Sequence, residues 1–413
     1  MFQLENRYIL ISLYSLGLLA FCNVSIAATS NQSSPYERGR VLESNFQQSI
    51  EIEWSGGFPL VDVKIGGETY KFLFDTGSKT TVIPSSLLDN KIINKIQEDI
   101  SITDSYGDVS GADLYSLPLL EVGGIRFSDF TVIASDFASQ FPVSCLGFTG
   151  ILGLNYLKDL NLKLDLAGNV IHISDQPFDD EGYIATSFKY SALGGVAIKI
   201  NFEFGDAWFV LDTGKNDAMQ IGDNSVFPYL EDYKYESRKQ RGSFSSSFQG
   251  VKENDEVTTY IIRNINIDNI FSIDSVPVDI DDSQMQLVGN EFLKYFSLIV
   301  EIPNNKIKFK KVSDEKITEG FKDTFGLTPM WGSEDKLYIS AITEQTPAYV
   351  AGLKIGDRIM SLNNQDTRHF DQGEYCSLIK KLSSNEESID TKNELDITVI
   401  REDGKLRSYQ LEK

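Results

Sequence analysis

Two copies of one tripeptide carry the side chains in this chain that are best suited to chemistry. Asp75-Thr76-Gly77, followed by Ser78, ends the apolar run Tyr70–Phe74, and Asp212-Thr213-Gly214 ends a second apolar run 137 residues later. A single Asp-Thr-Gly is usually a turn, because Asp accepts hydrogen bonds from nearby backbone N–H groups and Gly tolerates positive φ. Two copies in matching settings predict two carboxylates related by an internal repeat.

Such a pair of carboxylates has a defined chemistry. If the repeats pack about a pseudo-two-fold axis, Asp75 and Asp212 meet near it, and two carboxylates so close cannot both ionise cheaply. One therefore keeps a proton, and a general base and a general acid flank one water that can attack a peptide bond. No metal, cofactor or covalent intermediate is needed. The glycines allow close approach, and the hydroxyls of Thr76 and Thr213 can reach across the axis and hold the turns together.

The sequence around each tripeptide repeats as well. A Gly-Gly pair precedes each predicted hairpin, with Gly57 and Gly194 each 18 residues before the aspartate of its copy. Downstream, Ile151-Leu152-Gly153 and Leu287-Val288-Gly289 place a glycine 78 and 77 residues after that aspartate. Apolar and charged residues alternate in the strand before each tripeptide, as in half-buried strands. These matched landmarks predict a duplicated β-rich lobe.

Other chemistries lack their residues. The chain has two histidines, His172 and His369, without a nucleophile motif beside them, and it has neither His-Glu-x-x-His nor Cys-x-x-Cys. A Ser-His-Asp hydrolase and a zinc site are therefore excluded, and His172 is expected to be a hydrogen-bonded core residue. The net charge of −22 without a basic stripe argues against nucleic acid and against charge-driven binding to anionic lipid.

The paired Asp-Thr-Gly and apolar-apolar-Gly motifs resemble those of aspartic proteases of the pepsin and retropepsin type, over residues 48–312. The resemblance implies a mainly β, bilobal fold of acid-protease β-barrels, with lobe 1 at 48–180 and lobe 2 at 181–312. It also implies an endopeptidase that uses Asp75 and Asp212 on a polypeptide substrate, without metal or cofactor. Because one chain carries both aspartates, a monomer suffices for activity.

Members of this family cover the cleft with a hairpin flap. The matching segment in lobe 1 is Ile102–Leu117, with Tyr106 and Gly107 near its tip, although an ordinary turn remains the alternative. Lobe 2 offers a second hairpin, Gly242–Gly250.

One position departs from the family pattern. Lys215 follows Gly214, where members carry a small residue, while Ser78 at the equivalent position can hydrogen-bond the Asp75 carboxylate. An ammonium near the pair would favour the doubly ionised, inactive form, so Lys215 is expected to point to solvent. The alternative function is a catalytically inactive, peptide-binding adaptor with a protease fold.

The last part of the chain, residues 318–413, predicts a compact α+β module. Its run Thr346-Pro347-Ala348 to Gly356-Asp357-Arg358-Ile359 resembles PDZ domains of exported bacterial proteases. The resemblance implies that Phe325, Gly326 and Leu327 form a loop that captures the C-terminal carboxylate of a peptide ligand, and that a helix at Asp371–Leu382 walls the groove. The alternative is a brace between domains.

Residues 1–28 are typical of a secretory signal, with an apolar stretch at Tyr8–Phe21 and small residues before a cleavage site. We therefore expect export to the periplasm or outside the cell, with an uncleaved N-terminal anchor as the alternative. Residues 29–47 form a polar lead-in, whose self-processing is a weaker rival function. Cys145 and Cys376 lie in different predicted domains and are expected to remain unpaired.

Overall fold

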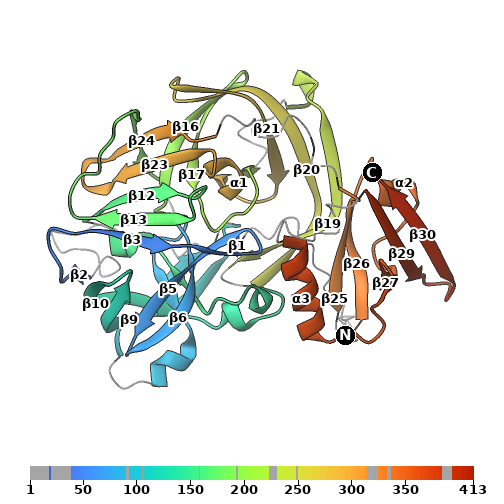
Figure 1. Ribbon diagram of the computed structural model, residues 1–413, viewed down its shortest axis with the longest axis horizontal. Helices are drawn as coiled ribbons and strands as arrows, with labels where there is room; N and C mark the ends of the chain where they lie inside the picture. Colours follow the sequence, from blue (N-terminus) through green and yellow to red (C-terminus); the bar gives the residue numbers. More distant parts are fainter. Residues whose placement is uncertain are drawn as a thin grey trace, which may run out of the picture.

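The computed structural model describes residues 18–19, 39–89, 93–104, 106–157, 159–191, 194–222, 230–247, 250–313, 321, 324–332, 336–383 and 393–413. The molecule is mainly β, as expected, and two lobes and a C-terminal module lie side by side (Figure 1). The predicted signal segment lies outside the described residues except for β1, Leu18–Leu19, which pairs with a strand of lobe 2.

Lobe 1 is a curved sheet closed by short 3-10 turns. Its strand β5 buries Val61, Val63 and Ile65 and exposes the intervening Asp62 and Lys64, which is the predicted alternation. The strands are β2 (Arg40–Val41), β3 (Gln47–Glu51), β4 (Glu53–Ser55), β5 (Phe58–Ile65), β6 (Glu68–Phe74), β7 (Thr81–Ile83), β8 (Asn94–Thr103), β9 (Val109–Val122), β10 (Ile125–Ala134), β11 (Gly150–Leu152), β12 (Asn161–Asp165) and β13 (Val170–Ser174). The turns are η2 (Ser85–Asp89), η3 (Phe137–Ser139), η4 (Val143–Leu146) and η5 (Leu154–Leu157).

Lobe 2 follows the same plan. Its hairpin β16–β17 corresponds to β5–β6 of lobe 1, and β22 corresponds to β11. Its elements are β14 (Ile184–Ser187), β15 (Lys189–Tyr190), β16 (Val196–Phe202), β17 (Gly205–Leu211), β18 (Met219–Gly222), η6 (Leu230–Tyr233), β19 (Ser237–Ser247), β20 (Gly250–Ile267), β21 (Phe271–Asp281), β22 (Gln286–Val288), α1 (Asn290–Leu293), β23 (Phe296–Glu301), η7 (Ile302–Asn304) and β24 (Lys306–Lys311).

A sheet shared by both lobes carries the pseudo-two-fold axis. Its strand order is β14-β24-β23-β12-β13-β3, so that β12 of lobe 1 pairs antiparallel with β23 of lobe 2. In the internal repeat, Asn161 corresponds to Ser297 and Asp165 corresponds to Glu301. Across the strand pair, Asn161 lies opposite Glu301 and Asp165 lies opposite Ser297. This register is self-complementary, as a two-fold axis requires. One apolar core runs through both lobes, from Ile50 to Phe309.

The C-terminal module is a small sheet with two helices. Its elements are β25 (Leu327–Gly332), β26 (Lys336–Thr343), α2 (Pro347–Val350), β27 (Arg358–Leu362), β28 (Gln365–Asp366), α3 (Gln372–Ser383), β29 (Glu394–Ile400) and β30 (Leu406–Glu412). It has an apolar core of its own. Strand β26 pairs with β19 of lobe 2, at Gln240↔Thr343 and Arg241↔Ile342, so the sheet continues from lobe 2 into the module.

The module is also bonded covalently to lobe 1. Cys145 in η4 and Cys376 in α3 form a disulfide, with their Cα atoms 4.8 Å apart. The expectation that these cysteines are unpaired is therefore wrong. It rested on their separation of 231 residues along the chain, whereas packing of α3 against η4 brings them together in space (Figure 1).

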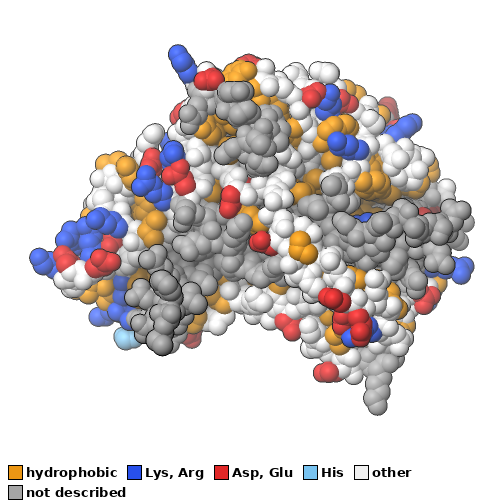
Figure 2. Space-filling view, turned by 180° about the vertical axis from the view of Figure 1, so that it is seen from behind, with side chains coloured by type: hydrophobic (Ala, Val, Ile, Leu, Met, Phe, Trp, Pro, Cys, Tyr) orange, Lys and Arg blue, Asp and Glu red, His pale blue; other side chains and the backbone are white. Residues whose placement is uncertain are grey.

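The surface carries charges of both signs. On the face in Figure 2, Lys and Arg side chains lie beside Asp and Glu side chains rather than in one basic stripe. His172 in β13 is half-buried, and its Nδ1 lies 2.8 Å from Ser49 Oγ, in agreement with a hydrogen-bonded structural residue. Within the described part of the chain, no helix has the length and hydropathy needed to cross a membrane.

Candidate active site

Each aspartate stands at the end of a central strand and is held there by the strand beside it. The backbone N–H of Asp75, after β6, donates to the Leu152 carbonyl at 3.1 Å. That of Asp212, after β17, donates to the Val288 carbonyl at 2.9 Å. The paired apolar-apolar segments before Gly153 and Gly289 therefore support the two Asp-Thr-Gly turns in the same way. Both aspartates are buried.

The two threonines hydrogen-bond across the axis. Thr76 Oγ1 donates to the Leu211 carbonyl at 2.7 Å and accepts from the Thr213 N–H at 3.1 Å. Thr213 Oγ1 donates to the Phe74 carbonyl at 2.6 Å and accepts from the Thr76 N–H at 3.0 Å. These four buried bonds join the two turns into one rigid unit, which is the arrangement that the repeat predicts for Thr76 and Thr213.

The Gly-Gly pairs allow the lobes to approach each other at the site. Gly57 has φ +82°, and a Cβ there would lie 3.1 Å from the Asn216 side chain of lobe 2. Gly194 has φ +92°, and a Cβ there would lie 2.7 Å from the Lys79 side chain of lobe 1. Asn216 and Lys79 occupy equivalent positions, four residues after each aspartate. Each Gly-Gly pair therefore packs on the turn of the opposite lobe.

The two carboxyls accept different numbers of hydrogen bonds. Asp75 Oδ1 accepts the N–H groups of Gly77, at 2.8 Å, and Ser78, at 3.0 Å, whereas Asp212 Oδ1 accepts only that of Gly214, at 2.8 Å. The Oδ2 atoms of both aspartates are buried, and no backbone N–H, hydroxyl or amide donor of the described residues reaches either of them, whereas the two carboxyls hydrogen-bond to each other when one is protonated. Each carboxyl thus has one oxygen fixed by its own turn and one available for chemistry.

The two carboxyls are protonated unequally. Burial, reinforced by repulsion from the Asp212 carboxylate, raises the pKa of Asp75 well above its usual range. Burial also raises the pKa of Asp212, to about 6, against the opposing effects of the Asp75 carboxyl, the Gly214 N–H and the Lys215 charge. The pair therefore holds on to one shared proton above the pH at which an isolated carboxyl would lose it, and the larger upward shift is that of Asp75. Two titratable groups with separated pKa values form an acid–base pair.

Comparison with known proteins identifies the domains that carry this geometry. The family model for the aspartyl protease matches residues 61–156, and that for the PDZ domain matches residues 312–389. The chain contains an aspartyl protease domain and a C-terminal PDZ domain. The solved structure of basic 7S globulin from soybean is similar to this chain, at a TM-score of 0.45 and 10% sequence identity. The match covers 67% of this chain and 99% of that one. No curated protein matches the chain.

Lys215 does not point to solvent, so that expectation is wrong. The side chain is 3% exposed, and its Nζ lies 3.2 Å from Asp217 Oδ2. Burial opposes its charge, but Asp217, Asp279 and Asp281 outweigh burial and raise the pKa of Lys215 above its ordinary value. An unpaired buried ammonium would be costly; Asp217 is the ion-pair partner of Lys215, and the charges of Asp279 and Asp281 in β21 add to the stabilisation.

The Ser78 hydroxyl does not contact the Asp75 carboxylate, contrary to the expectation. Its Oγ donates to the Thr80 carbonyl at 2.9 Å, and only its backbone N–H reaches Asp75. Ser78 therefore shapes the turn of the protease domain through its hydroxyl and stabilises the carboxylate through its backbone.

The expected flap is a hairpin, formed by β8 and β9, whose strands extend beyond the predicted bounds. At its turn Asp104 Oδ1 accepts the N–H groups of Tyr106, at 3.0 Å, and Asp108, at 2.9 Å. Tyr106 is 5% exposed, and a Cβ on Gly107 would lie 2.5 Å from the Gln284 side chain of lobe 2. The tip of the lobe 1 hairpin thus touches lobe 2. The second predicted hairpin, Gly242–Gly250, belongs to the longer pair β19–β20.

Sequence reasoning missed two asparagines that support the site. Asn155 Oδ1 accepts the N–H and the hydroxyl of Thr81, at 3.1 and 2.8 Å. Asn290 Nδ2 donates to the carbonyls of Gly57, at 3.0 Å, and Thr213, at 2.9 Å, and thereby ties the two lobes together. Their signal was present, since each asparagine lies within two residues of a repeated glycine, Gly153 or Gly289.

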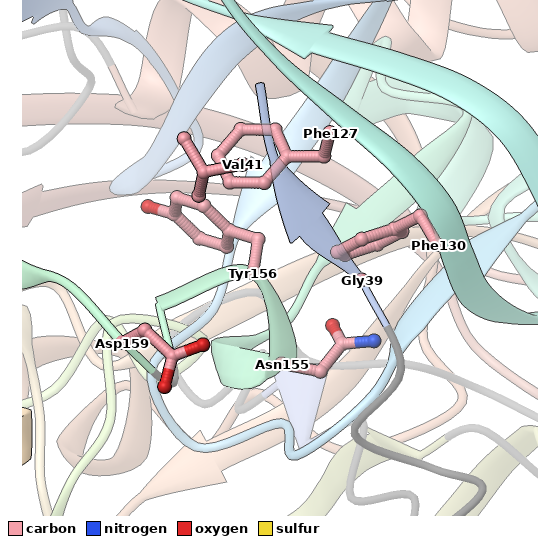
Figure 3. Close-up of a pocket in the computed structure, with 7 residues that line it drawn as sticks. All are labelled: Gly39, Val41, Phe127, Phe130, Asn155, Tyr156 and Asp159. Carbon is pink, nitrogen blue, oxygen red and sulfur yellow. The ribbon is translucent and has the colours of Figure 1, made fainter. Parts of the chain in front are cut away.

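The small pocket in Figure 3 lies apart from the two aspartates. It is lined by β2, β10, η5 and nearby residues, including Phe127, Phe130 and Tyr156, and neither Asp75 nor Asp212 takes part. Among the described residues, no group of three acidic, histidine or cysteine side chains could hold a metal ion.

In the PDZ domain the predicted carboxylate loop precedes β25. Gly326 has φ +75°, and its N–H donates to Thr324 Oγ1 at 3.2 Å. Phe325 and Leu327 pack into the core of the domain, and the predicted second wall of the groove is present as α3. The segments that the prediction assigned to the loop and to its two flanking walls are therefore folded as a turn, a strand and a helix.

Proposed function

We propose that the chain is an exported aspartic endopeptidase in which Asp75 and Asp212 activate one water for attack on a peptide bond. The observation that carries the proposal is the pair of buried, interacting carboxyls, each with an Oδ2 that no backbone N–H, hydroxyl or amide donor of the described residues reaches. The rigid Thr76–Thr213 unit supports it, because preorganised groups need no rearrangement during the reaction. One chain supplies both aspartates, so a monomer suffices.

In the proposed reaction the two aspartates have different roles. Asp212 has the lower pKa, so its carboxylate acts as the base that takes a proton from the water. Asp75 carries the proton and acts as the acid that donates it to the oxygen of the scissile carbonyl. We also propose that the β8–β9 hairpin, whose tip at Tyr106 and Gly107 contacts Gln284 of lobe 2, acts as a flap that binds the polypeptide substrate and excludes bulk water.

The test of this function uses the mature chain, residues 29–413, and a mixed peptide library between pH 4 and 8. Cleavage by the wild type and its loss in both Asp75→Asn and Asp212→Asn are the expected results. The matched control is Asp129→Asn, the same change at an exposed position whose φ of +52° suits asparagine. No wild-type cleavage at any pH would favour the inactive adaptor. Loss in only one of the two variants would contradict the shared mechanism.

Export rests on the sequence of residues 1–28 and is supported by the Cys145–Cys376 disulfide, because disulfides persist in oxidising compartments. N-terminal sequencing of the protein recovered from the periplasm or the medium checks it. The expected product begins after residue 28, whereas a chain retained in the cytoplasm with its first 28 residues intact would contradict export.

For the PDZ domain we propose a groove between β25 and α3 that can bind the C-terminal residues of a peptide, with Phe325, Gly326 and Leu327 as the carboxylate loop. Strand β25 pairs with β26 along one edge, and no other described strand pairs with its second edge. An extended peptide can add to a strand edge of this kind.

A further inference from the structure

The loop that leads from η3 through η4 has two apolar faces. Phe137, Val143 and Leu146 pack into a cluster of lobe 1. Phe141 and Cys145, which lie between them in the sequence, pack instead into the core of the PDZ domain. Residues 137–146, the wedge loop, therefore belong to lobe 1 by one face and to the PDZ domain by the other.

Phe141 bridges the two walls of the PDZ groove. Its ring centroid lies 5.4 Å from that of Trp331 in β25 and 5.3 Å from that of Tyr375 in α3. The two walls also contact each other at this level, since Tyr375 Oη donates to Met330 Sδ at 3.3 Å. A ring that packs on both walls occupies the space between them, and aromatic contacts of this kind add to the apolar area buried.

The disulfide holds the wedge loop in that place. Cys145 is 3% exposed and bonds to Cys376, the residue after Tyr375 in α3. Phe141 is tethered on both sides, by the disulfide at Cys145 and by the chain that leads from β10, so it stays near the groove even when it leaves it. A tethered ligand of this type competes at an effective concentration near the millimolar range.

The occupied end of the groove is the one farther from the carboxylate loop. Leu327 is the last residue of this loop and the first of β25, and Trp331 lies four residues later near the end of β25. An extended peptide that starts at Gly326 and runs along β25 covers about 3.3 Å per residue, so its fourth or fifth residue would meet Phe141. The Gly326 N–H, a donor for an incoming carboxylate, already donates to Thr324 Oγ1.

A second anchor fixes the PDZ domain to lobe 2. Besides the β19–β26 pairing, Glu344 N–H donates to the Lys239 carbonyl at 2.8 Å, and Arg241 Nη2 lies 3.0 Å from Glu344 Oε1. The domain is thus joined to lobe 1 through its groove and to lobe 2 through its sheet. Its groove cannot release lobe 1 by simple rotation of the whole domain.

We propose that the wedge loop of lobe 1 is a built-in ligand of the PDZ groove, locked by the Cys145–Cys376 disulfide, and that the oxidised protein does not bind free peptide C-termini there. The inference rests on the contacts of the PDZ domain and on its proposed peptide groove, and it is independent of protease activity. Free peptides bind only when the wedge loop is displaced. The apparent affinity for such a peptide therefore equals its affinity for the open groove multiplied by the fraction of molecules whose groove is open.

The binding test uses the full mature chain in an Asp75→Asn background, so that the probe is not cleaved. The probe is a fluorescent pool of hexapeptides with free C-termini, compared with the same pool carrying C-terminal amides. The oxidised parent should show no preference for the free-carboxylate pool. Phe141→Asp combined with Cys145→Ser and Cys376→Ser should bind that pool at least about tenfold more tightly than the parent does. Leu119→Asp, at an exposed site of lobe 1, is the matched control and should behave as the parent.

A second measurement does not depend on the choice of probe. Hydrogen exchange of the β25 amides, those of residues 327–332 other than Pro329, should accelerate in the open variant and in the milder Phe141→Ala with both cysteines replaced. Equal exchange in parent and open variants, or equal binding of the free-carboxylate pool by both, would overturn the proposal. If Cys145 and Cys376 were recovered as free thiols from protein purified without reductant, the proposal that their disulfide holds the wedge loop in the groove would be wrong.

Discussion

The turns at Asp75 and Asp212 have the same backbone frame and different electrostatic surroundings. Each is supported by an apolar-apolar-Gly segment and tied to the other by a threonine. In lobe 1 the residue after the glycine is Ser78, whose N–H adds a second hydrogen bond to the carboxylate. In lobe 2 it is Lys215, buried with the carboxylates of Asp217, Asp279 and Asp281. The two turns share one geometry, and the residue after the glycine is one source of the electrostatic difference between them.

In the proposed reaction that inequality assigns the roles of acid and base. A symmetric pair would share its proton equally, whereas the hydrogen bond from the Asp75 carboxyl, the Gly214 N–H and the Lys215 charge together hold the pKa of Asp212 below what burial alone would give. Lys215 does not force both carboxyls to ionise, because burial and the Asp212 charge still raise the pKa of Asp75. The departure from the family pattern is therefore compatible with an active site.

The largest expected effect on stability comes from Lys215→Met. Removing one partner of a buried charge cluster costs about 3–5 kcal/mol, because Asp217, Asp279 and Asp281 would be left without their cation. Urea unfolding measures the loss. Lys64→Met, which removes an exposed pair with Glu121, should cost no more than about 1 kcal/mol. A loss as small as this in Lys215→Met would mean that the cluster does not hold the lysine as a charged group.

The second effect tests the symmetric part of the site. Thr76→Val and Thr213→Val each remove a hydroxyl that donates to a carbonyl and accepts an N–H across the lobe interface, so each should cost about 1–3 kcal/mol. The two losses in urea unfolding should agree with each other. Thr69→Val, at an exposed position of β6, is the control. A large difference between the two losses would contradict an equivalent role in the two lobes.

The third effect is the pH dependence of the proposed activity. Asp212 must be ionised to act as base, so kcat/KM should fall tenfold per pH unit as the pH drops below about 6, the pKa of this group. On the alkaline side activity persists until Asp75 loses its proton. A pH profile with cleaved library peptides measures this. An acid limb near pH 2 would contradict the assignment of Asp212 as the group with the raised pKa of about 6.

The smallest effect concerns Ser78→Ala. The hydroxyl donates to the Thr80 carbonyl and not to the carboxylate, so its loss should cost about 1 kcal/mol and leave the acid limb unmoved. Unfolding and a pH profile of the same variant check both statements. A displaced acid limb would show that the hydroxyl contributes to the charge state of the pair after all.

Much of the fold and the central pair could be predicted from the sequence, because they depend on local patterns. The alternation of apolar and charged residues predicts the strands, and glycines predict the turns between them. The repeated motifs, which lie at nearly the same spacing from each aspartate, predict two lobes and the meeting of Asp75 with Asp212. The strands and helices of the PDZ domain follow in the same way. The two supporting asparagines were within reach of the same repeat.

Only the tertiary structure decided where Lys215 points, which atom Ser78 Oγ contacts, and that Cys145 bonds to Cys376. For Lys215 and Cys145 the partners include residues far away in the sequence, so local patterns do not specify them. For Ser78 both possible acceptors, the Asp75 carboxylate and the Thr80 carbonyl, are near in the sequence, and only the folded turn decides between them. Asp279 and Asp281 lie on β21, and α3 lies on η4 through the packing of a whole domain. Sequence periodicity reports which face of an element is buried, and it does not report which other element covers that face. The aspartate pair was predictable because the duplication itself specified its partner, whereas Lys215 and the wedge loop have no such internal copy.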